Sequence, residues 1–468
     1  MTFYYRTEEL QKMQNRYENG DWECVVIYGR RRVGKTALIN EFCKDKPTIY
    51  FSALNAPAQE NLQALSKAIY QFSKPDTDAY PVYTSFESAL DEVTRIGNER
   101  VVFVIDEYPY LAKAEPSISS RIQHLIDHKW QNSKLFLILC GSSMSFMQNQ
   151  VLGYESPLYG RRTAQFKVEP LTYLETAIFN PQLSPEENAY VFGITGGIPH
   201  YINKLGIKSN LDDAVIDCVF DRSGYLFEEP ENLLKQELRE PGLYNSMIKV
   251  IAEGSSRLNE IATKVGMESG ACSKYLSVLI ELGIIRKESP ITEYRGKKTV
   301  YRIEDNFFRF WYRFVPQNLS MISSGRFPMA YNRLVKSQMH DYMGLIFEKM
   351  CKEYLIRYAA DMPFDIAEVG QWWGADPITK NQIQIDIVGV PVKEPNQRVT
   401  RYLIGSCKFK NEKIDINELE RIQNYAYVFA RNAEFNYVIF SLGGFTERLK
   451  AEAKHSNIRL ITLADMYK

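Results

Sequence analysis

The feature that most constrains this chain is a glycine-rich loop between a predicted strand and a predicted helix near the N-terminus. Residues 24–28 are continuously hydrophobic, residues Gly29 to Thr36 match the spacing G-x-x-x-x-G-K-T, and a helical spacing of apolar residues starts at Lys35. Glycines let successive backbone N–H groups turn around an anion, and the N-terminus of the following helix adds partial positive charge. The motif therefore predicts a phosphate-binding loop in an α/β fold.

The residues of this loop have expected roles in binding a nucleotide. Lys35 should reach the β- and γ-phosphates, and the hydroxyl of Thr36 should ligate Mg²⁺. Arg30, Arg31 and Arg32 lie within the loop and could touch phosphate. Roles in solvent or between domains are the favoured interpretation for them. The predicted nucleotide-binding residues are Gly29, Arg30, Arg31, Arg32, Val33, Gly34, Lys35, Thr36 and Ala37.

A second apolar run, residues 101–105, ends in the acidic pair Asp106-Glu107. A buried strand that ends this way presents both carboxylates at the carboxyl edge of a parallel sheet, where ligands bind in open α/β folds. Asp106 is placed to hold Mg²⁺ through water, and Glu107 can polarise the attacking water as a general base. Together with the loop, this pair predicts hydrolysis of the nucleotide as well as binding.

Two further candidates follow along the chain. A strand over 135–140 leads into Ser142, whose hydroxyl could position water and sense the γ-phosphate; a simple strand-end turn is the alternative. Arg161 and Arg162 precede a predicted strand at 165–168. Arg161 could stabilise charge on the transferred phosphoryl group, in cis or from a neighbouring subunit, and a surface arginine pair is the alternative.

Taken together, these motifs resemble the archaeal-type ATPase family, a STAND-like branch of the AAA+ class. The segments that carry the resemblance are GRRRVGKT, VVFVIDE, LILCGSS, SPLYGRR and GGIPHYI, and it extends over roughly residues 6–230. The resemblance implies ATP as the nucleotide and a sheet in which an inserted strand separates the two Walker strands. Many AAA+ proteins carry a sensor arginine in the lid, but Gly196–His200 supplies none.

The pattern of elements predicts five segments. Strands and helices alternate over the first 170 residues, which indicates a doubly wound parallel sheet. The expected organisation is a P-loop ATPase core (1–170), a helical lid (171–240), a winged helix-turn-helix (241–305), an aromatic-rich linker (306–340) and a C-terminal α/β domain resembling restriction endonucleases (341–468).

The segment 241–305 combines three short helical patterns with two strand-like runs, which resembles a winged helix-turn-helix. The third helix would expose Ser269, Ser273, Lys274 and Ser277 to DNA. The wing is basic, as phosphate contacts require, through Arg286, Lys287, Arg295, Lys297, Lys298 and Arg302. The alternative is a winged helix used for protein contacts or domain packing.

The last block carries the spacing of a metal-dependent nuclease of the PD-(D/E)XK class. A helical Glu348, a strand Asp386 and a strand ending in Lys408 match its pattern, and Glu368 fits the same layout. Carboxylates in that class hold Mg²⁺ and the lysine orients water. Ser406 replaces the expected acidic residue, so either Glu348 or Glu368 supplies the missing charge or the domain is a degenerate interaction module.

Composition bounds the remaining possibilities. Hydrophobic residues make up 45% of the chain and 57 basic residues balance 57 acidic ones, so the chain is globular and its net charge leaves DNA binding open. Scattered cysteines and the lack of a signal-peptide or membrane-spanning pattern predict a cytoplasmic protein with no membrane partner. A homo-oligomer or a protein partner is compatible with the sequence.

We therefore expect an ATP-binding and ATP-hydrolysing switch that uses Mg²⁺ and acts on or near DNA through the winged helix and the C-terminal domain. The alternatives are an ATP-regulated, Mg²⁺-dependent DNA nuclease, and a nucleotide-binding regulator or scaffold without enzymatic activity.

Overall fold

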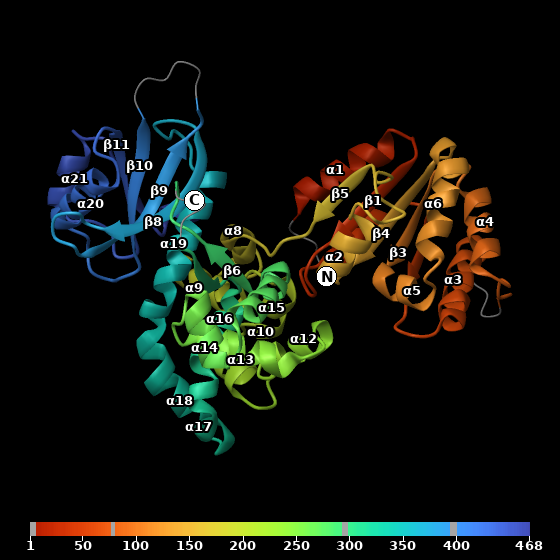
Figure 1. Cartoon of the computed structure of the whole chain (residues 1–468), viewed down its shortest axis with the longest axis horizontal. Helices are drawn as coiled ribbons and strands as arrows, with labels where there is room; N and C mark the ends of the chain where they lie inside the picture. The colour runs from red at the N-terminus through yellow and green to blue at the C-terminus, as the bar shows by residue number, and fades with distance from the viewer. Residues whose placement is uncertain (1–5, 76–79, 293–297, 394–399) are drawn as a thin grey trace. The chain divides into compact units, whose positions relative to one another are not determined.

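A computed structural model describes residues 6–75, 80–292, 298–393 and 400–468 (Figure 1). The chain divides into two compact units, one formed by Met1–Pro170 with Ile198–His200 and the other by Leu171–Gly197 with Tyr201–Lys468. The division after Pro170 coincides with the predicted end of the ATPase core. The segments expected to follow it as separate domains pack into one unit.

The first unit contains a five-stranded parallel sheet. Its strands are β1 (Glu23–Tyr28), β2 (Thr48–Ser52), β3 (Val101–Asp106), β4 (Leu135–Gly141) and β5 (Ala164–Lys167), in the order β2-β3-β4-β1-β5. Strand β4 separates β1, which precedes the loop, from β3, which carries the acidic pair, and this confirms the strand order expected from the family. Every residue of β1, β3 and β4 is buried, as central strands of a parallel sheet require.

Helices cover both faces of this sheet (Figure 1). They are α1 (Thr7–Glu18), α2 (Lys35–Cys43), α3 (Ala58–Ser73), α4 (Phe86–Ile96), α5 (Tyr108–Ala114), α6 (Ile118–His128) and the short α7 (Met144–Phe146). On one face the rings of Tyr17 in α1, Phe42 in α2 and Phe136 in β4 lie 5.2–6.0 Å apart. Helices α3 to α6 form the apolar core of the other face. The carboxyl ends of β1, β3 and β4 therefore meet at one edge.

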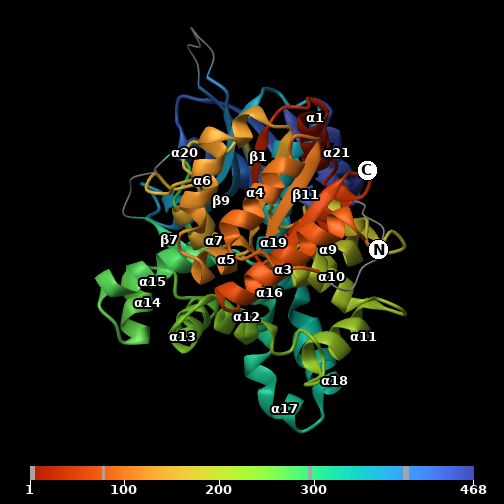
Figure 2. The same ribbon diagram turned by 90° about the vertical axis from the view of Figure 1, so that its right-hand side faces the viewer.

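The second unit begins with helices and continues into the segment predicted as a winged helix. The helices are α8 (Tyr173–Ala177), α9 (Pro185–Thr195), α10 (Pro199–Leu205), α11 (Leu211–Val215), α12 (Glu229–Glu237), α13 (Pro241–Ala252), α14 (Leu258–Val265) and α15 (Ser269–Glu281). Helices α13, α14 and α15 pack together (Figure 2) and are followed by the antiparallel strands β6 (Ile285–Glu288) and β7 (Val300–Ile303).

The aromatic-rich segment is the centre of this unit. Helix α16 (Asn306–Phe314), at the start of the predicted linker, buries all of its aromatic side chains. It is followed by α17 (Leu319–Ser323), α18 (Phe327–Ala330) and the long α19 (Met339–Arg357). The hydroxyl of Tyr342 in α19 donates one hydrogen bond shared between the carbonyls of Gly193, at 2.6 Å, and Asn306, at 2.9 Å. One buried side chain thus joins three helices from three predicted segments.

The C-terminal part is a mixed five-stranded sheet. Its strands are β8 (Ile366–Ala375), β9 (Gln382–Pro391), β10 (Arg401–Lys408), β11 (Glu434–Ser441) and β12 (Ile458–Thr462), in the order β12-β11-β10-β9-β8. Pairs β8–β9 and β9–β10 are antiparallel, and the other two pairs are parallel. Helix α19 packs on one face, whereas α20 (Ile416–Phe429) and α21 (Glu447–Ala453) pack on the other.

Candidate functional site

The phosphate-binding loop lies between β1 and α2, as the motif predicts. Gly34 has a left-handed backbone, with φ 94°, at the start of α2, a conformation that L-residues with a side chain disfavour. Gly29 is needed for a different reason, because a Cβ at this position would lie 2.3 Å from the carbonyl oxygen of Val168. Both glycines of the motif are therefore required by the shape of the loop.

Lys35 is buried inside its own loop, with 6% of its surface exposed. Its ammonium donates hydrogen bonds to the backbone carbonyls of Gly29, at 2.8 Å, and Arg30, at 3.0 Å. Burial lowers the pKa of Lys35, while nearby anionic groups, including Glu107 and Asp106, oppose that change. The loop thus holds a desolvated cation on neutral backbone oxygens, an arrangement that favours an incoming anion.

Thr36 and Asp106 meet as expected for a Mg²⁺ site. The Thr36 hydroxyl donates to Asp106 Oδ2 at 3.2 Å. The same oxygen accepts a hydrogen bond from the hydroxyl of Tyr50 on the adjacent strand β2, at 2.8 Å. A hydroxyl and a carboxylate are hard oxygen donors of the kind that Mg²⁺ prefers, so Thr36 and Asp106 would hold the ion at this edge of the sheet. The sequence pattern does not identify Tyr50, because its position depends on β2 lying beside β3.

Glu107 and Ser142 are brought together across the ends of β3 and β4. The Ser142 hydroxyl donates to Glu107 Oε2 at 2.9 Å, and Ser142 is 3% exposed. Glu107 itself has a left-handed backbone, with φ 51°, directly before α5. A non-glycine residue in this conformation is strained, and such strain is common at functional sites. The hydroxyl predicted to sense the nucleotide therefore holds the predicted general base.

Two arginines connect the phosphate-binding loop to other segments of the first unit, and the sequence pattern does not predict these contacts. Arg6, which is 5% exposed, donates to the carbonyls of Val33, at 2.9 Å, and Glu169, at 2.5 Å. It joins the loop to the residues after β5 and is a positioning residue that sequence analysis missed. Arg31 donates to the hydroxyl of Tyr110 at 2.8 Å, which gives one of the three loop arginines a contact with α5.

The structure does not bring Arg161 to this site. It lies before β5, whose Ala164 pairs with Val25 near the amino end of β1, whereas the loop follows the carboxyl end. Its guanidinium forms two 2.8 Å hydrogen bonds with the carboxylate of Asp127, at the end of α6. The prediction that Arg161 acts in cis is therefore wrong in this arrangement, because the strand runs away from the loop at that end.

A second cluster of charged residues lies in the C-terminal sheet. Asp386 of β9 accepts a hydrogen bond from the backbone N–H of Cys407 at 3.1 Å, and Lys408 lies 3.6 Å from the same carboxylate. Glu348 of α19 lies close to Asp386 and accepts a hydrogen bond from the side chain of Gln371. Burial, with the charge of Asp386 adding to it, raises the pKa of Glu348 to about 7.

The charge missing at Ser406 is supplied by a residue that the sequence pattern did not predict. Glu418, on α20, accepts a hydrogen bond from the Ser406 hydroxyl and lies 3.4 Å from Lys408. Glu368, by contrast, is an exposed residue near the start of β8, opposite Val390, and the proposal that it joins Asp386 is not supported. Glu418 follows Lys408 by ten positions in the sequence. It can reach the strand only because α20 folds back over β10.

These carboxylates do not form a preformed metal site. Within the described ranges, no three His, Cys, Asp or Glu side chains converge as they would around a cation. Glu348 comes from α19 and Glu418 from α20, which cover opposite faces of the sheet. Arg421 also binds the carboxylate of Glu418, with its Nε 3.0 Å from Oε2. As they lie, these residues do not fit a bound Mg²⁺.

Two of the six basic residues predicted for the wing form ion pairs within the unit. Arg286 binds Glu304 at 2.7 Å, and Arg302 lies 3.3 Å from Glu288. Arg295 and Lys297 lie outside the described residues, and Lys287 and Lys298 are exposed. Both arginines were predicted to contact DNA phosphates, and in the structure each already pairs with a carboxylate, on β6 or in the turn after β7.

Comparisons with known proteins identify an ATPase domain in the part of the chain that includes the first unit. A family described as an ATPase domain predominantly from Archaea matches residues 3–205, and a family of archaeal and bacterial proteins of unknown function matches residues 311–422. An uncharacterized protein of Methanocaldococcus jannaschii is 33% identical over 377 residues, which cover 79% of this chain and 82% of the relative. An uncharacterized ATP-binding protein of the same organism is 41% identical over 44 residues, or 9% of this chain and 75% of that protein.

One solved structure shares the fold. The Walker-type ATPase PABY2304 of Pyrococcus abyssi has a TM-score of 0.51 and 20% sequence identity, with 66% of this chain and 96% of that chain covered.

Among the described residues, no helix combines the length and the apolar character that crossing a bilayer requires.

Proposed function

This chain belongs to the family of ATPases found predominantly in Archaea, and we propose that it uses ATP binding and hydrolysis at Gly29–Thr36, Asp106 and Glu107 as a switch that acts on or near DNA. The observation that carries the proposal is the joint arrangement of two hydrogen-bonded pairs, Thr36 with Asp106 and Glu107 with Ser142, beside the buried Lys35. These groups supply the cation, the metal ligands and the base that phosphoryl transfer to water needs.

Each residue has a stated part in the proposed reaction. The loop backbone and Lys35 bind the β- and γ-phosphates, and Lys35 exchanges its two backbone carbonyl acceptors for phosphate oxygens. Thr36 and Asp106 would hold Mg²⁺, and the ion would neutralise charge on the phosphates. Glu107 accepts a proton from the attacking water, and Ser142 orients the Glu107 carboxylate.

The hydrolysis step is tested with matched variants. Purified wild type, Lys35→Ala, Glu107→Gln and Lys44→Ala are compared for phosphate release from Mg²⁺-ATP. Lys44 is an exposed lysine at the end of α2 and serves as the control. We expect loss of turnover in the first two variants only. Turnover that is unchanged in Lys35→Ala and Glu107→Gln would disprove the assignment, and nucleotide binding without Glu107-dependent turnover would favour the non-enzymatic regulator.

The proposed action on DNA is supported by the exposed face of α15. Ser269, Lys274 and Ser277 are exposed there, whereas Leu276 and Leu279 are buried. Because this face carries a single lysine, we expect weak, salt-dependent binding with little base specificity. Fluorescence anisotropy of a duplex with Mg²⁺-ATP, Mg²⁺-ADP or no nucleotide tests this part. Equal affinity in all three states would contradict a nucleotide-dependent switch.

A second candidate function is an ATP-regulated, Mg²⁺-dependent DNA nuclease, in which the C-terminal cluster resembles the PD-(D/E)XK site. One observation favours it: Glu418 provides a carboxylate beside Ser406 and Lys408, where the sequence lacks an acidic residue. Because these residues do not fit a bound cation as they lie, we assign no reaction step to them. Plasmid and linear DNA are incubated with Mg²⁺ or Mn²⁺ and with wild type, Asp386→Ala, Lys408→Ala or Glu418→Ala. Equal products from all four proteins exclude the nuclease.

A further inference from the structure

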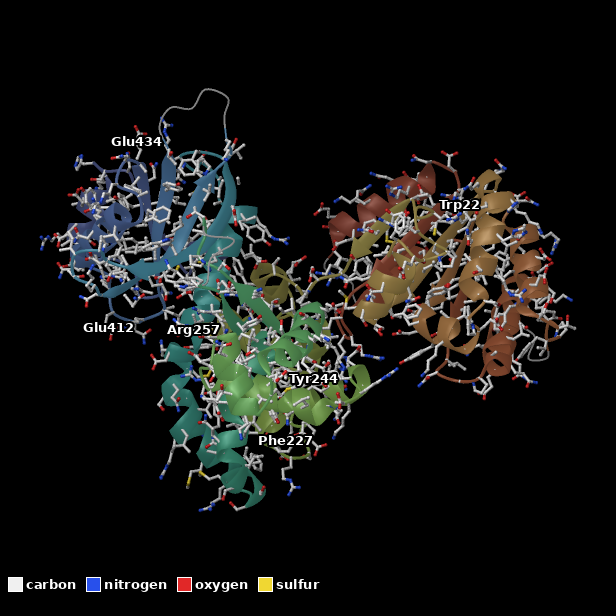
Figure 3. The ribbon with its side chains drawn as sticks, viewed as in Figure 1. Trp22, Phe227, Tyr244, Arg257, Glu412 and Glu434 are labelled. Carbon is white, nitrogen blue, oxygen red and sulfur yellow. The ribbon has the colours of Figure 1, made fainter. Side chains whose placement is uncertain are left out.

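A cavity in the second unit is lined by three arginines that have no part in the proposed ATPase. It measures about 350 Å³ and lies among the turn after α13, strand β7, helix α16 and helix α19. Its polar side is formed by Arg302, Arg309 and Arg313 with the serines of the turn, and its apolar side includes Ile251 and Leu345. We call it the arginine pocket. Arg257, labelled in Figure 3, directly follows the two serines, Ser255 and Ser256, in sequence.

Local carboxylates are too few to neutralise the cations around this pocket. Glu288 of β6 and Glu304 in the turn after β7 each already have more than one basic partner. The cations paired with them are Arg286, Arg302, Lys349 and Lys352. Glu348 of α19 also interacts with Arg302, but burial raises the pKa of this carboxyl to about 7, which weakens its negative charge. In the described part of the chain, no ion pair joins either Arg309 or Arg313 to a carboxylate within 4.0 Å. The pocket therefore has excess positive charge.

The guanidinium of Arg309 is buried in the pocket wall and fixed there by a backbone hydrogen bond. Its Nη2 donates to the backbone carbonyl of Ile303 at 2.7 Å, which fixes the guanidinium at the wall of the cavity. Burial lowers the pKa of Arg309, and the nearby cations Arg286 and Arg302 lower it further, against the opposing effects of Tyr342 and Glu304. Removing a guanidinium from water next to like charges is unfavourable unless an anion compensates for it.

We propose that the arginine pocket binds a phosphoryl group through Arg302, Arg309 and Arg313. Guanidinium groups present pairs of N–H donors that match the oxygens of a phosphate, and such charge-assisted hydrogen bonds are among the strongest in proteins. A phosphate monoester carries nearly two negative charges at neutral pH. It therefore compensates the charge of three arginines better than a ligand with a single carboxylate does. A cavity of about 350 Å³ also has the size of a small-ligand site.

The phosphoryl group can come from a small phosphorylated molecule or from a nucleic-acid backbone. The apolar wall of Ile251 and Leu345 suits the organic part of a small ligand. The turn before α14 also lies next to the helices predicted to approach DNA. The chemistry recognised is the same, so the experiment has one arm for each source.

The test uses the full chain carrying Lys35→Ala, so that the phosphate-binding loop is impaired. Sodium pyrophosphate is titrated by calorimetry at constant ionic strength, and hydrogen exchange of residues 251–256 and 301–303 is measured with and without it. Arg309→Gln and Arg313→Gln are made in this background. The control is Arg333→Gln, an exposed arginine elsewhere in the same unit. A second arm measures binding of a short DNA duplex by anisotropy.

We expect pyrophosphate to slow exchange in both segments, and each pocket variant to weaken binding roughly tenfold or more, with no change in the control. Loss of duplex binding in the pocket variants, without a pyrophosphate effect, supports the same proposal with a nucleic-acid source. If Arg309→Gln does not fold, Arg313→Gln decides. Unchanged affinity for both probes in a folded Arg313→Gln protein, together with unchanged exchange in both segments, would overturn the proposal.

Discussion

The candidate nucleotide site and the C-terminal charged cluster each place a lysine near carboxylates, and they differ in how their charges are balanced. In the first unit, Lys35 binds two neutral backbone carbonyls, and Asp106 and Glu107 accept hydrogen bonds from hydroxyl groups. In the second unit, Lys408 lies 3.4–3.6 Å from Glu418 and Asp386, and Arg421 binds Glu418 as well.

This difference indicates which site is ready for a charged ligand. At the loop, an anion that binds Lys35 displaces backbone carbonyls, and a cation that binds Asp106 displaces hydroxyl groups. All of these partners are neutral, so ligand binding does not break an ion pair. At the C-terminal cluster, a cation must compete with Lys408 and Arg421 for the same carboxylates. Breaking a partly buried pair leaves an uncompensated charge, which is costly. We therefore expect strong ligand dependence at the first site and weak dependence at the second.

The largest effect should follow from removing the cation of the first site. Lys35→Ala is expected to lower the turnover number by roughly 100- to 1,000-fold, because a group that stabilises charge on the transferred phosphoryl is lost. Phosphate release under saturating Mg²⁺-ATP measures this. Lys408→Ala, the matching change at the second site, should leave ATP turnover within about twofold of wild type. Equal losses in both variants would show that the two sites are not independent.

Changing the base of the first site should separate binding from chemistry. Glu107→Gln keeps a hydrogen-bond acceptor for Ser142 but removes the carboxylate, so turnover should fall by roughly 100-fold while nucleotide affinity stays close to wild type. Single-turnover hydrolysis and nucleotide binding are measured on the same preparation. A large loss of affinity with normal single-turnover hydrolysis would contradict the role of Glu107 as a base.

The two sites also differ in how far sequence alone could define them. Gly29–Thr36 is contiguous, and Asp106 and Glu107 end a buried strand, so the local pattern and the geometry of parallel sheets predict that these residues lie at one edge of the sheet. Tyr50 and Arg6 could not be predicted, because their contacts depend on strand order and on a fold that places Arg6 beside Glu169. Glu418 was missed for the same reason: a helix after the strand carries it, and only tertiary packing returns it to Ser406.

The second site should gain cation affinity when a competing charge is removed. In Arg421→Gln, Glu418 loses its guanidinium partner, so we expect Mn²⁺ to bind roughly tenfold more tightly than in wild type. Calorimetric titration is performed in a Lys35→Ala background without nucleotide. Adding Asp386→Ala should abolish the gain, and the exposed Lys413→Gln serves as a charge-matched control. If Arg421→Gln binds no more Mn²⁺ than wild type, the arginine is not the competitor.

A smaller effect is expected from the ionisation of Glu348. Its pKa of about 7 lies above the ordinary value of 4.5, so between these pH values the folded state binds more protons than the unfolded state. The free energy of unfolding contributed by this group is therefore highest below about pH 4.5 and falls as the pH rises through 7. Glu348→Gln should raise the melting temperature at pH 8 by roughly 2–4 °C and have a much smaller effect at pH 5. Glu412→Gln, an exposed change, should have no effect at either pH.

The smallest effect on ATP turnover should come from Arg161, the residue that sequence analysis had placed with the phosphate site. Its guanidinium is held by Asp127 before the amino end of β5, and it forms no part of the loop edge. Arg161→Ala should therefore change turnover by less than about twofold in dilute protein, since distant sites act independently. The lost surface ion pair should lower the free energy of unfolding by only about 0.2–1 kcal/mol. Turnover is measured across a wide range of protein concentrations. A tenfold loss at every concentration would restore a role in cis, whereas a loss confined to high concentration would assign the arginine to the site of a neighbouring copy.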